Sequence, residues 1–146
     1  MIRNKKVMDN KKFDPEDRLV KFACMCPDVC DLLPNNKTGQ NLEYQLSKSS
    51  TSSALVYGEA QAAVSKADFI HKMRVVLKEI RESRVNLRII IEKPVIMNEK
   101  VQIAFKEANE LMAIFLKSIE RRNKIKLLQL SDSLFCFLFI ISFISS

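Results

Sequence analysis

Apolar residues recur at intervals of three and four along most of the chain, which is the period of a helix with one buried face. The pattern is clearest between residues 66 and 92. The apolar positions there are Phe69, Ile70, Met73, Val76, Leu77, Ile80, Leu87 and Ile90. Ser65, with Asp68 three residues on, resembles a capping box and predicts the start of this helix, and Pro94 follows its predicted end at Glu92.

A first helix is predicted to begin at Asp14, which suits the N-cap, with Pro15 at the first helical position. Its predicted buried face consists of Leu19, Phe22, Ala23, Cys26, Val29, Cys30 and Leu33. Pro27 lies inside this pattern and predicts a kink or an early break, because proline lacks the backbone N–H that a helix interior uses. Residues 34–39 have the composition of a loop.

The stretch from Gln40 to Ala63 is rich in small hydroxyl residues. These are Ser47, Ser49, Ser50, Thr51, Ser52 and Ser53. Serine tracts often form linkers, but apolar residues flank this tract in helical register and no glycine or proline interrupts it. We therefore predict a helix whose small side chains allow a neighbouring helix to approach closely, with hydroxyls bonded back to its own carbonyls.

Asn98 is a suitable N-cap for a fourth helix that is predicted to run to Arg122. Its apolar positions are Val101, Phe105, Ala108, Leu111, Met112, Phe115 and Ile119. Four amphipathic helices with short connections predict an all-α fold, an antiparallel up-down four-helix bundle over residues 13–123. We expect residues 1–12 to form a flexible basic N-terminus.

Residues 124–146 form a hydrophobic C-terminal tail. Its apolar run from Leu134 to Ile144 is broken only by Ser142 and is shorter than the roughly 20 residues that a membrane-spanning helix needs. A membrane anchor is therefore the less favoured interpretation. Packing on the bundle, a role in an interface and an accidental extension of the reading frame remain open.

The residues that are able to carry chemistry do not form a catalytic or metal-binding pattern. The single histidine, His71, has no evident acidic partner, and no phosphate-binding glycine loop or nucleophile elbow occurs. Cys24, Cys26 and Cys30 suggest a metal site at first, but we interpret them as buried small apolar residues, since two thiols on one helix face complete no tetrahedral site. We expect no cofactor and no metal.

Glu59 and Glu79 are candidates for an acid–base pair, although we favour a role as acceptors for Lys or Arg on neighbouring helices. With no catalytic motif elsewhere, the protein is predicted to be non-enzymatic. The first thirteen residues are charged and contain no apolar stretch, so we expect no signal peptide and a cytoplasmic location.

The formal net charge of +7 favours a polyanionic partner. Five cations follow one another at steps of three and four on the predicted third helix, and Lys72 lies near them. The candidate nucleic-acid-binding residues are Lys72, Arg74, Lys78, Arg81, Arg84 and Arg88. The alternative is a solvated face that Glu79 and Glu82 partly neutralise, and Arg84, nearest the apolar stripe, is expected to pair internally.

An ordered set of short motifs runs through the second and third predicted helices. It consists of Gln45, Leu46, Lys48, Ser49, Thr51 and Ser52, then Glu59 and Ala60, then Ser65, Lys66 and Phe69, then Lys78, Glu79, Arg81 and Glu82. In order and spacing this set resembles the four-helix-bundle proteins encoded in intervening sequences of bacterial large-subunit ribosomal RNA genes. That family is related to an accessory protein of diversity-generating retroelements.

The resemblance implies a homo-oligomer, typically a homopentamer, with a basic surface around its pore. It also implies RNA or DNA as a partner, and a partner protein such as a reverse transcriptase, with no enzymatic activity. Two functions therefore stand as hypotheses. The first is an oligomeric protein that binds nucleic acid through a basic helix face. The second is a structural scaffold that binds other proteins and has no nucleic-acid role.

Overall fold

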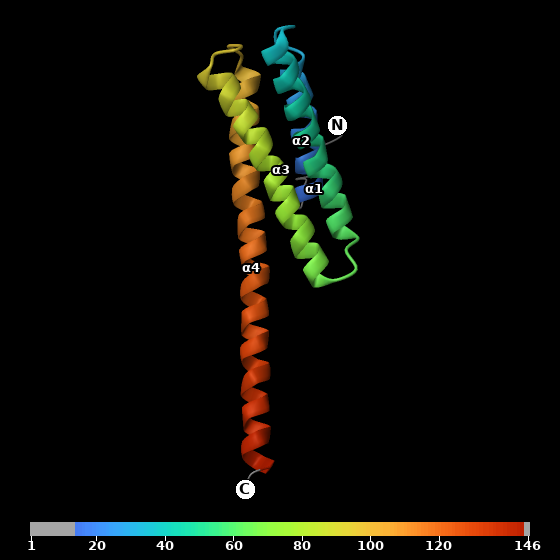
Figure 1. Cartoon of the computed structure of the whole chain (residues 1–146), viewed down its shortest axis with the longest axis vertical. Coiled ribbons are helices and arrows are strands. Elements are labelled where there is room, and N and C mark those ends of the chain that lie inside the picture. Colours follow the sequence, from blue (N-terminus) through green and yellow to red (C-terminus); the bar gives the residue numbers. More distant parts are fainter. Residues whose placement is uncertain (1–13, 145–146) are drawn as a thin grey trace, which may run out of the picture.

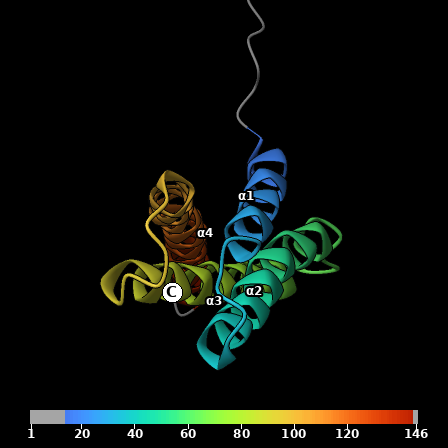
Figure 2. The same cartoon turned by 90° about the horizontal axis from the view of Figure 1, so that it is seen from above.

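The computed structural model describes the backbone of residues 14–144 and the side chains of residues 14–124. It contains four helices: α1 (Pro15–Cys30), α2 (Lys37–Gln61), α3 (Lys66–Glu92) and α4 (Glu99–Ile144). Consecutive helices run in opposite directions (Figure 1). α2 packs between α1 and α3, α4 packs against α3 and α1, and the four helices surround one core (Figure 2). The predicted all-α, antiparallel four-helix bundle is confirmed.

The starts of three helices follow from their N-cap residues. In each case a side-chain oxygen accepts a hydrogen bond from a backbone N–H two or three residues further on, over 2.9 Å for Asp14, 3.1 Å for Ser65 and 2.9 Å for Asn98. These bonds satisfy N–H groups that have no partner within the helix. The predicted starts at these three residues are confirmed.

The start of α2 depends on a close approach of the backbone. Asn36 is the N-cap, and its side-chain oxygen accepts a hydrogen bond from the N–H of Gly39 over 2.9 Å. A Cβ atom on Gly39 would lie 1.9 Å from the carbonyl oxygen of Pro34. Only glycine therefore fits where the loop folds back on the first turn of α2.

α1 continues through Pro27, so of the two expected alternatives, a kink or an early break, the early break is wrong. The helix ends three residues later, at Cys30, and the N–H of Asp31 donates to the carbonyl of Pro27 over 3.0 Å. Proline removes one helical hydrogen bond. The last turn remains helical because it buries Val29 and Cys30 in the core, with exposed fractions of 0% and 8%.

All four helices contribute to the core. The largest side chains that are fully buried are Phe22, Phe115, Leu19, Leu46, Ile80, Leu87, Ile90 and Leu111. Tyr57 on α2 meets Phe115 on α4 across the bundle, with ring centroids 5.5 Å apart and planes at 88°. This edge-to-face geometry is a favoured arrangement of aromatic rings.

The serine-rich tract is helical, as predicted, and its small side chains are buried. Ser49, Ser50 and Ser53 have exposed fractions of 2%, 0% and 0%. The hydroxyl of Ser49 donates to the carbonyl of Gln45 over 2.8 Å and lies 2.7 Å from the hydroxyl of Ser83 on α3. The tract is therefore the contact surface of α2 with its neighbours, and every buried hydroxyl on it has a partner.

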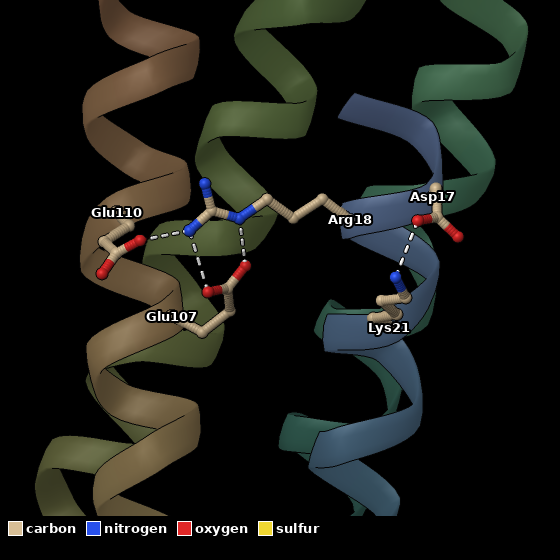
Figure 3. A network of polar contacts seen from close by, with 5 residues as sticks. All are labelled: Asp17, Arg18, Lys21, Glu107 and Glu110. Carbon is tan, nitrogen blue, oxygen red and sulfur yellow. Dashed lines mark hydrogen bonds and ion pairs between the residues drawn. The ribbon is translucent and has the colours of Figure 1, made fainter. Parts of the chain in front are cut away.

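A charged cluster connects α1 to α4 at the edge of the bundle (Figure 3). The Nε of Arg18 lies 2.5 Å from one carboxylate oxygen of Glu107, and its Nη2 lies 2.9 Å from the other. Nη2 also donates to Glu110. Hydrogen bonding to Glu107 raises the pKa of Arg18 above its usual value, so the guanidinium of this bidentate bridge stays charged at every physiological pH.

α4 continues well beyond its predicted end at Arg122. It runs without a break to Ile144, and its C-terminal part extends past the other three helices (Figure 1). The boundary that we predicted at residue 123 therefore lies inside a continuous helix. Within the part of the chain that the structure describes, no helix combines the length and apolar character needed to cross a membrane. The predicted N-terminus, residues 1–12, lies outside the described residues.

Candidate nucleic-acid interface

Four of the six candidate cations lie exposed on the outward side of α3: Arg74, Lys78, Arg81 and Arg88. The helix presents them to solvent because its opposite side carries the apolar stripe, from Met73 through Ile80 to Ile90, into the core. The structure thus brings these four together. It places Lys72 and Arg84 differently, since both are half-buried.

Lys78 and Arg88 are paired with acids of their own helix. The Nζ of Lys78 lies 3.3 Å from a carboxylate oxygen of Glu79 and 3.0 Å from one of Glu82. Hydrogen bonds to Glu82 and then Glu79 raise the pKa of Lys78. The Nε of Arg88 lies 2.6 Å from Glu92. Glu79 and Glu82 neutralise part of the positive charge of this face, as predicted, but both pair with the same residue, Lys78.

Arg84 faces α4, as its position beside the apolar stripe predicts. Its Nε donates to the side-chain oxygen of Asn109 over 2.5 Å, and its guanidinium carbon lies 5.4 Å from the ring centre of Phe105. This cation–π contact and hydrogen bond use the side chain to join α3 to α4. Arg84 is therefore a structural residue, and we remove it from the interface.

Lys72 also belongs to a contact between helices. Its Nζ lies 3.3 Å from Glu59 on α2 and 3.9 Å from Asp68 on α3. Three-quarters of its side chain is covered. The expectation that Glu59 accepts from a neighbouring helix is confirmed, whereas Glu79 pairs within its own helix and departs from that expectation.

Arg74 and Arg81 are the two candidates that remain available. Both are exposed, and neither forms a hydrogen bond or an ion pair with any other residue in the described range. They stand seven residues apart, so two helical turns, about 10 Å, separate them on one side of α3. Lys78 lies between them.

A shallow groove beside Arg81 lies where α2 meets α3, with a volume of about 400 Å³. Its lining residues are Gln45, Lys78, Arg81, Glu82, Val85 and Asn86. Gln45 and Asn86 add side-chain amides, which donate and accept hydrogen bonds. The helix pattern does not predict these two as site residues, because only the packing of α2 on α3 brings Gln45 and Asn86 to one groove.

The bundle itself carries little of the net charge. Residues 14–124 contain eighteen Lys and Arg against fifteen Asp and Glu, while residues 1–13 contain five Lys and Arg against one Asp. Most of the excess of +7 therefore precedes α1. Among the candidate cations, the positive charge without a partner in the described range lies at Arg74 and Arg81.

The cysteines of α1 separate into two environments. Burial raises the pKa of the Cys26 thiol to about 12 and that of Cys30 to about 11. These two are buried, as predicted, but Cys24 is exposed, so the prediction of a buried small residue is wrong for Cys24. Among the residues with described side chains, no group of three or more Cys, His, Asp or Glu is placed to hold a metal ion. The tail residue Cys136 lies outside that range.

No family model matches the sequence, and no curated protein does. One solved structure similar to this chain is a protein of unknown function from the S23 ribosomal protein family of Bacteroides thetaiotaomicron. The two superpose with a TM-score of 0.67 and 26% sequence identity, over 73% of this chain and 98% of that chain. The two proteins share a fold. The predicted resemblance is thereby supported at the level of a helical bundle similar to an S23-family protein.

Proposed function

We propose that this protein is a non-enzymatic, cytoplasmic bundle protein that assembles with copies of itself and binds the phosphate backbone of RNA through the outward face of α3. One observation carries the proposal: of the six candidate cations, only Arg74 and Arg81 are exposed without a partner among the described residues. Lys72, Lys78 and Arg88 pair with acids, and Arg84 bonds to Asn109. Exposed guanidinium groups bind phosphate bidentately, so two on one face provide contacts independent of base sequence.

The spacing of the two arginines suits a nucleic-acid strand. Measured along the axis of a B-form duplex, where one strand carries a phosphate about every 3.4 Å, about 10 Å covers roughly three phosphates. Lys78 lies between them and shares its charge with Glu79 and Glu82, so it contributes less. The face carries no aromatic residue at positions 74, 78, 81, 85 or 88, so stacking on bases is not part of the proposal.

Assembly is needed for this face to act strongly. A single bundle has an excess of only three positive charges over residues 14–124, whereas a ring of copies repeats the pair of arginines and focuses their field. A homopentamer is the form that the sequence resemblance implies. The S23 ribosomal name of the structural neighbour supports RNA as the polyanion.

We extend the proposal to the wider family that the sequence resembles. A relation to proteins encoded in ribosomal RNA intervening sequences would place this chain near ribosomal RNA. A relation to the retroelement accessory protein would make a reverse transcriptase its protein partner. The motif order from Gln45 to Glu82 supports both.

The test compares two double variants with the same change in charge. Arg74→Gln with Arg81→Gln removes the available pair, and Lys37→Gln with Lys106→Gln removes two exposed lysines on α2 and α4. Affinity for a structured RNA is measured by fluorescence anisotropy at several salt concentrations. The arginine variant should bind at least about tenfold more weakly and lose up to about two units of salt slope per subunit.

The lysine variant should change affinity by less than about threefold. Equal losses in both variants would show that net charge alone acts, and unchanged binding by the arginine variant would refute the proposed face. Sedimentation velocity of the same proteins, with and without RNA, tests assembly. A monomer at all concentrations would refute the oligomeric part of the proposal.

A second function, a protein-binding scaffold, is favoured by apolar residues on the same two helices. Val85 and Ile89 on α3 are 46% and 42% exposed, and Tyr44 and Leu55 on α2 are 60% and 66% exposed. Faces that mix Arg with apolar and aromatic residues are typical of protein interfaces. Charge reversal at Arg74, Arg81 and Arg88 separates the two functions. If the protein binds RNA through this face, RNA binding is lost. If it is a scaffold, self-assembly or partner binding is retained.

A further inference from the structure

A second polar pocket lies where α2, α3 and α4 meet, near the N-terminus of α3, and it is unrelated to the outward face of α3. Its volume is about 270 Å³. The residues that matter among its lining are Tyr57, Gln61, Phe69, Ser118, Arg121 and Arg122. Three helices thus bring hydroxyl, amide and guanidinium groups to one place.

The hydroxyl of Tyr57 is a free donor. Its ring is fixed against Phe115, and only 9% of the residue is exposed. The hydroxyl bonds to no other residue of the described chain. Every fully buried side-chain N or O atom described has a partner, so this hydroxyl is not fully buried, and Tyr57 is one of the residues that line the pocket.

The proton of this hydroxyl is retained at neutral pH. Burial raises the pKa of Tyr57, and the negative charges of Asp14 and Glu16 raise it further. These two acids belong to the start of α1, where Asp14 is the N-cap. The two cations among the residues that line the pocket, Arg121 and Arg122, both belong to α4.

Arg122 is held in place without a carboxylate. Its guanidinium carbon lies 4.6 Å from the ring centre of Phe69, a cation–π contact that leaves the N–H groups of the guanidinium edge unused. Arg121 is exposed beside it, and neither arginine pairs with an acid among the described residues. Arg18, at the α1–α4 edge, shows the contrast, since two carboxylates surround it.

We propose that this pocket binds a phosphate group, held by Arg121, Arg122 and the hydroxyl of Tyr57. All three side chains donate hydrogen bonds, and two of them carry a full positive charge, which matches an anion with several acceptor oxygens. The volume suits a single phosphate better than a drug-sized ligand, because pockets for such ligands occupy about 300–1,000 Å³. Free inorganic phosphate and a phosphate monoester share this chemistry.

The chain provides its own reporter for the test. It contains no tryptophan and two tyrosines, Tyr44 and Tyr57. Tyr44 is exposed on α2, so a Tyr44→Phe variant leaves Tyr57 as the only tyrosine. Titration of this full-length variant with inorganic phosphate should change its tyrosine fluorescence saturably, with a dissociation constant on the order of 1 mM or tighter.

The variants separate a phosphate site from general charge. In the same background, Arg121→Gln with Arg122→Gln should weaken phosphate binding at least about tenfold, and Lys37→Gln with Lys106→Gln less than about twofold. Tyr57→Phe, followed by calorimetry, should weaken binding while thermal unfolding remains cooperative. No saturation with phosphate, equal affinity for acetate, or equal losses in the two charge variants would each overturn the proposal.

A mononucleotide identifies the source of the phosphate. Tighter binding of adenosine monophosphate than of inorganic phosphate would assign the pocket to a phosphate monoester, and equal binding would assign it to phosphate alone. The Arg74→Gln, Arg81→Gln variant should bind phosphate normally here. This inference and the RNA-binding proposal therefore succeed or fail separately.

Discussion

α2 and α3 lie side by side and run antiparallel, yet they are built from different residues. α2 has four charged residues among 25, and α3 has eleven among 27. α2 buries Ser49, Ser50 and Ser53, so its backbone comes close to its neighbours, whereas α3 buries larger apolar side chains and places its charges outward. The difference shows that one helix provides tight packing and the other provides the chemically distinctive surface.

The two helices also satisfy their polar groups differently. The buried hydroxyls of α2 bond to carbonyls of their own helix. Four of the six candidates on α3 have a partner, such as Glu82, Glu92 or Asn109. The two candidates without a partner among the described residues, Arg74 and Arg81, are the ones that the proposed function uses.

The largest loss of stability is expected from placing a large side chain on the closely packed serine side of α2. Ser50 has an exposed fraction of 0%, so Ser50→Leu inserts a large side chain where α2 packs on α1. We expect the free energy of unfolding to fall by about 3 kcal/mol, from overpacking and the loss of a buried hydrogen bond. Urea denaturation measures it. Thr51→Leu, at the next and exposed position, is the control and should change stability by less than about 0.5 kcal/mol.

The two glycines of α2 test backbone packing separately from side-chain packing. Gly39→Ala places a Cβ 1.9 Å from the carbonyl oxygen of Pro34 and should lower the free energy of unfolding by about 2 kcal/mol, since the loop must shift. At Gly58 a Cβ meets nothing within 4 Å, so Gly58→Ala should raise it by about 1 kcal/mol. Thermal unfolding of both variants compares them. A stable Gly39→Ala protein would contradict the close approach described here.

The dependence of stability on alkaline pH tests whether water is excluded from the Cys26 thiol between α1 and α2. Burial raises the pKa of Cys26 from 9.0 to about 12, and the hydrogen bond with Ser50 acts in the opposite direction. Between these pH values the unfolded chain loses the thiol proton and the folded chain keeps it, so stability falls as pH rises. The loss should be about 1 kcal/mol per pH unit. Cys26→Ala should show a shallower decline between pH 9 and 11 than the wild type, and equal slopes would contradict this account.

The smallest effect is expected on the charged face of α3. Arg88 and Glu92 form an exposed ion pair, and such pairs contribute little because water screens them. Arg88→Gln should change the free energy of unfolding by less than about 0.5 kcal/mol in urea denaturation. A larger loss would show that the face stabilises the bundle and is less free to serve a partner.

Most of the fold could be predicted because it depends on local signals. The caps at Asp14, Ser65 and Asn98 and the apolar stripes depend on residues within a few positions of one another, and these predictions agree with the structure. The helix through the serine tract could be predicted for the same reason. The passage of α1 through Pro27 could not, because it depends on how well Val29 and Cys30 pack against other helices.

The candidate site was less predictable than the fold. A helix pattern shows that Arg74, Lys78, Arg81 and Arg88 share a face, but whether each is paired depends on side-chain rotamers and neighbouring helices. Arg84 could be assigned to the interior from its position beside the apolar stripe. The pairing of Lys72 with Glu59, and the presence of Tyr57 and Arg122 around one pocket, depend on how three helices are placed in space.

α4 has a mechanical consequence for the pocket beside it. The helix has 46 residues, so it is about 69 Å long. Residues 123–144 continue it for about 30 Å beyond Arg122 without a break. Because the helix is continuous, a rotation or tilt of its C-terminal end also moves Arg121 and Arg122. The position of the Arg122 guanidinium over Phe69 is therefore coupled to the position of the C-terminal end of α4.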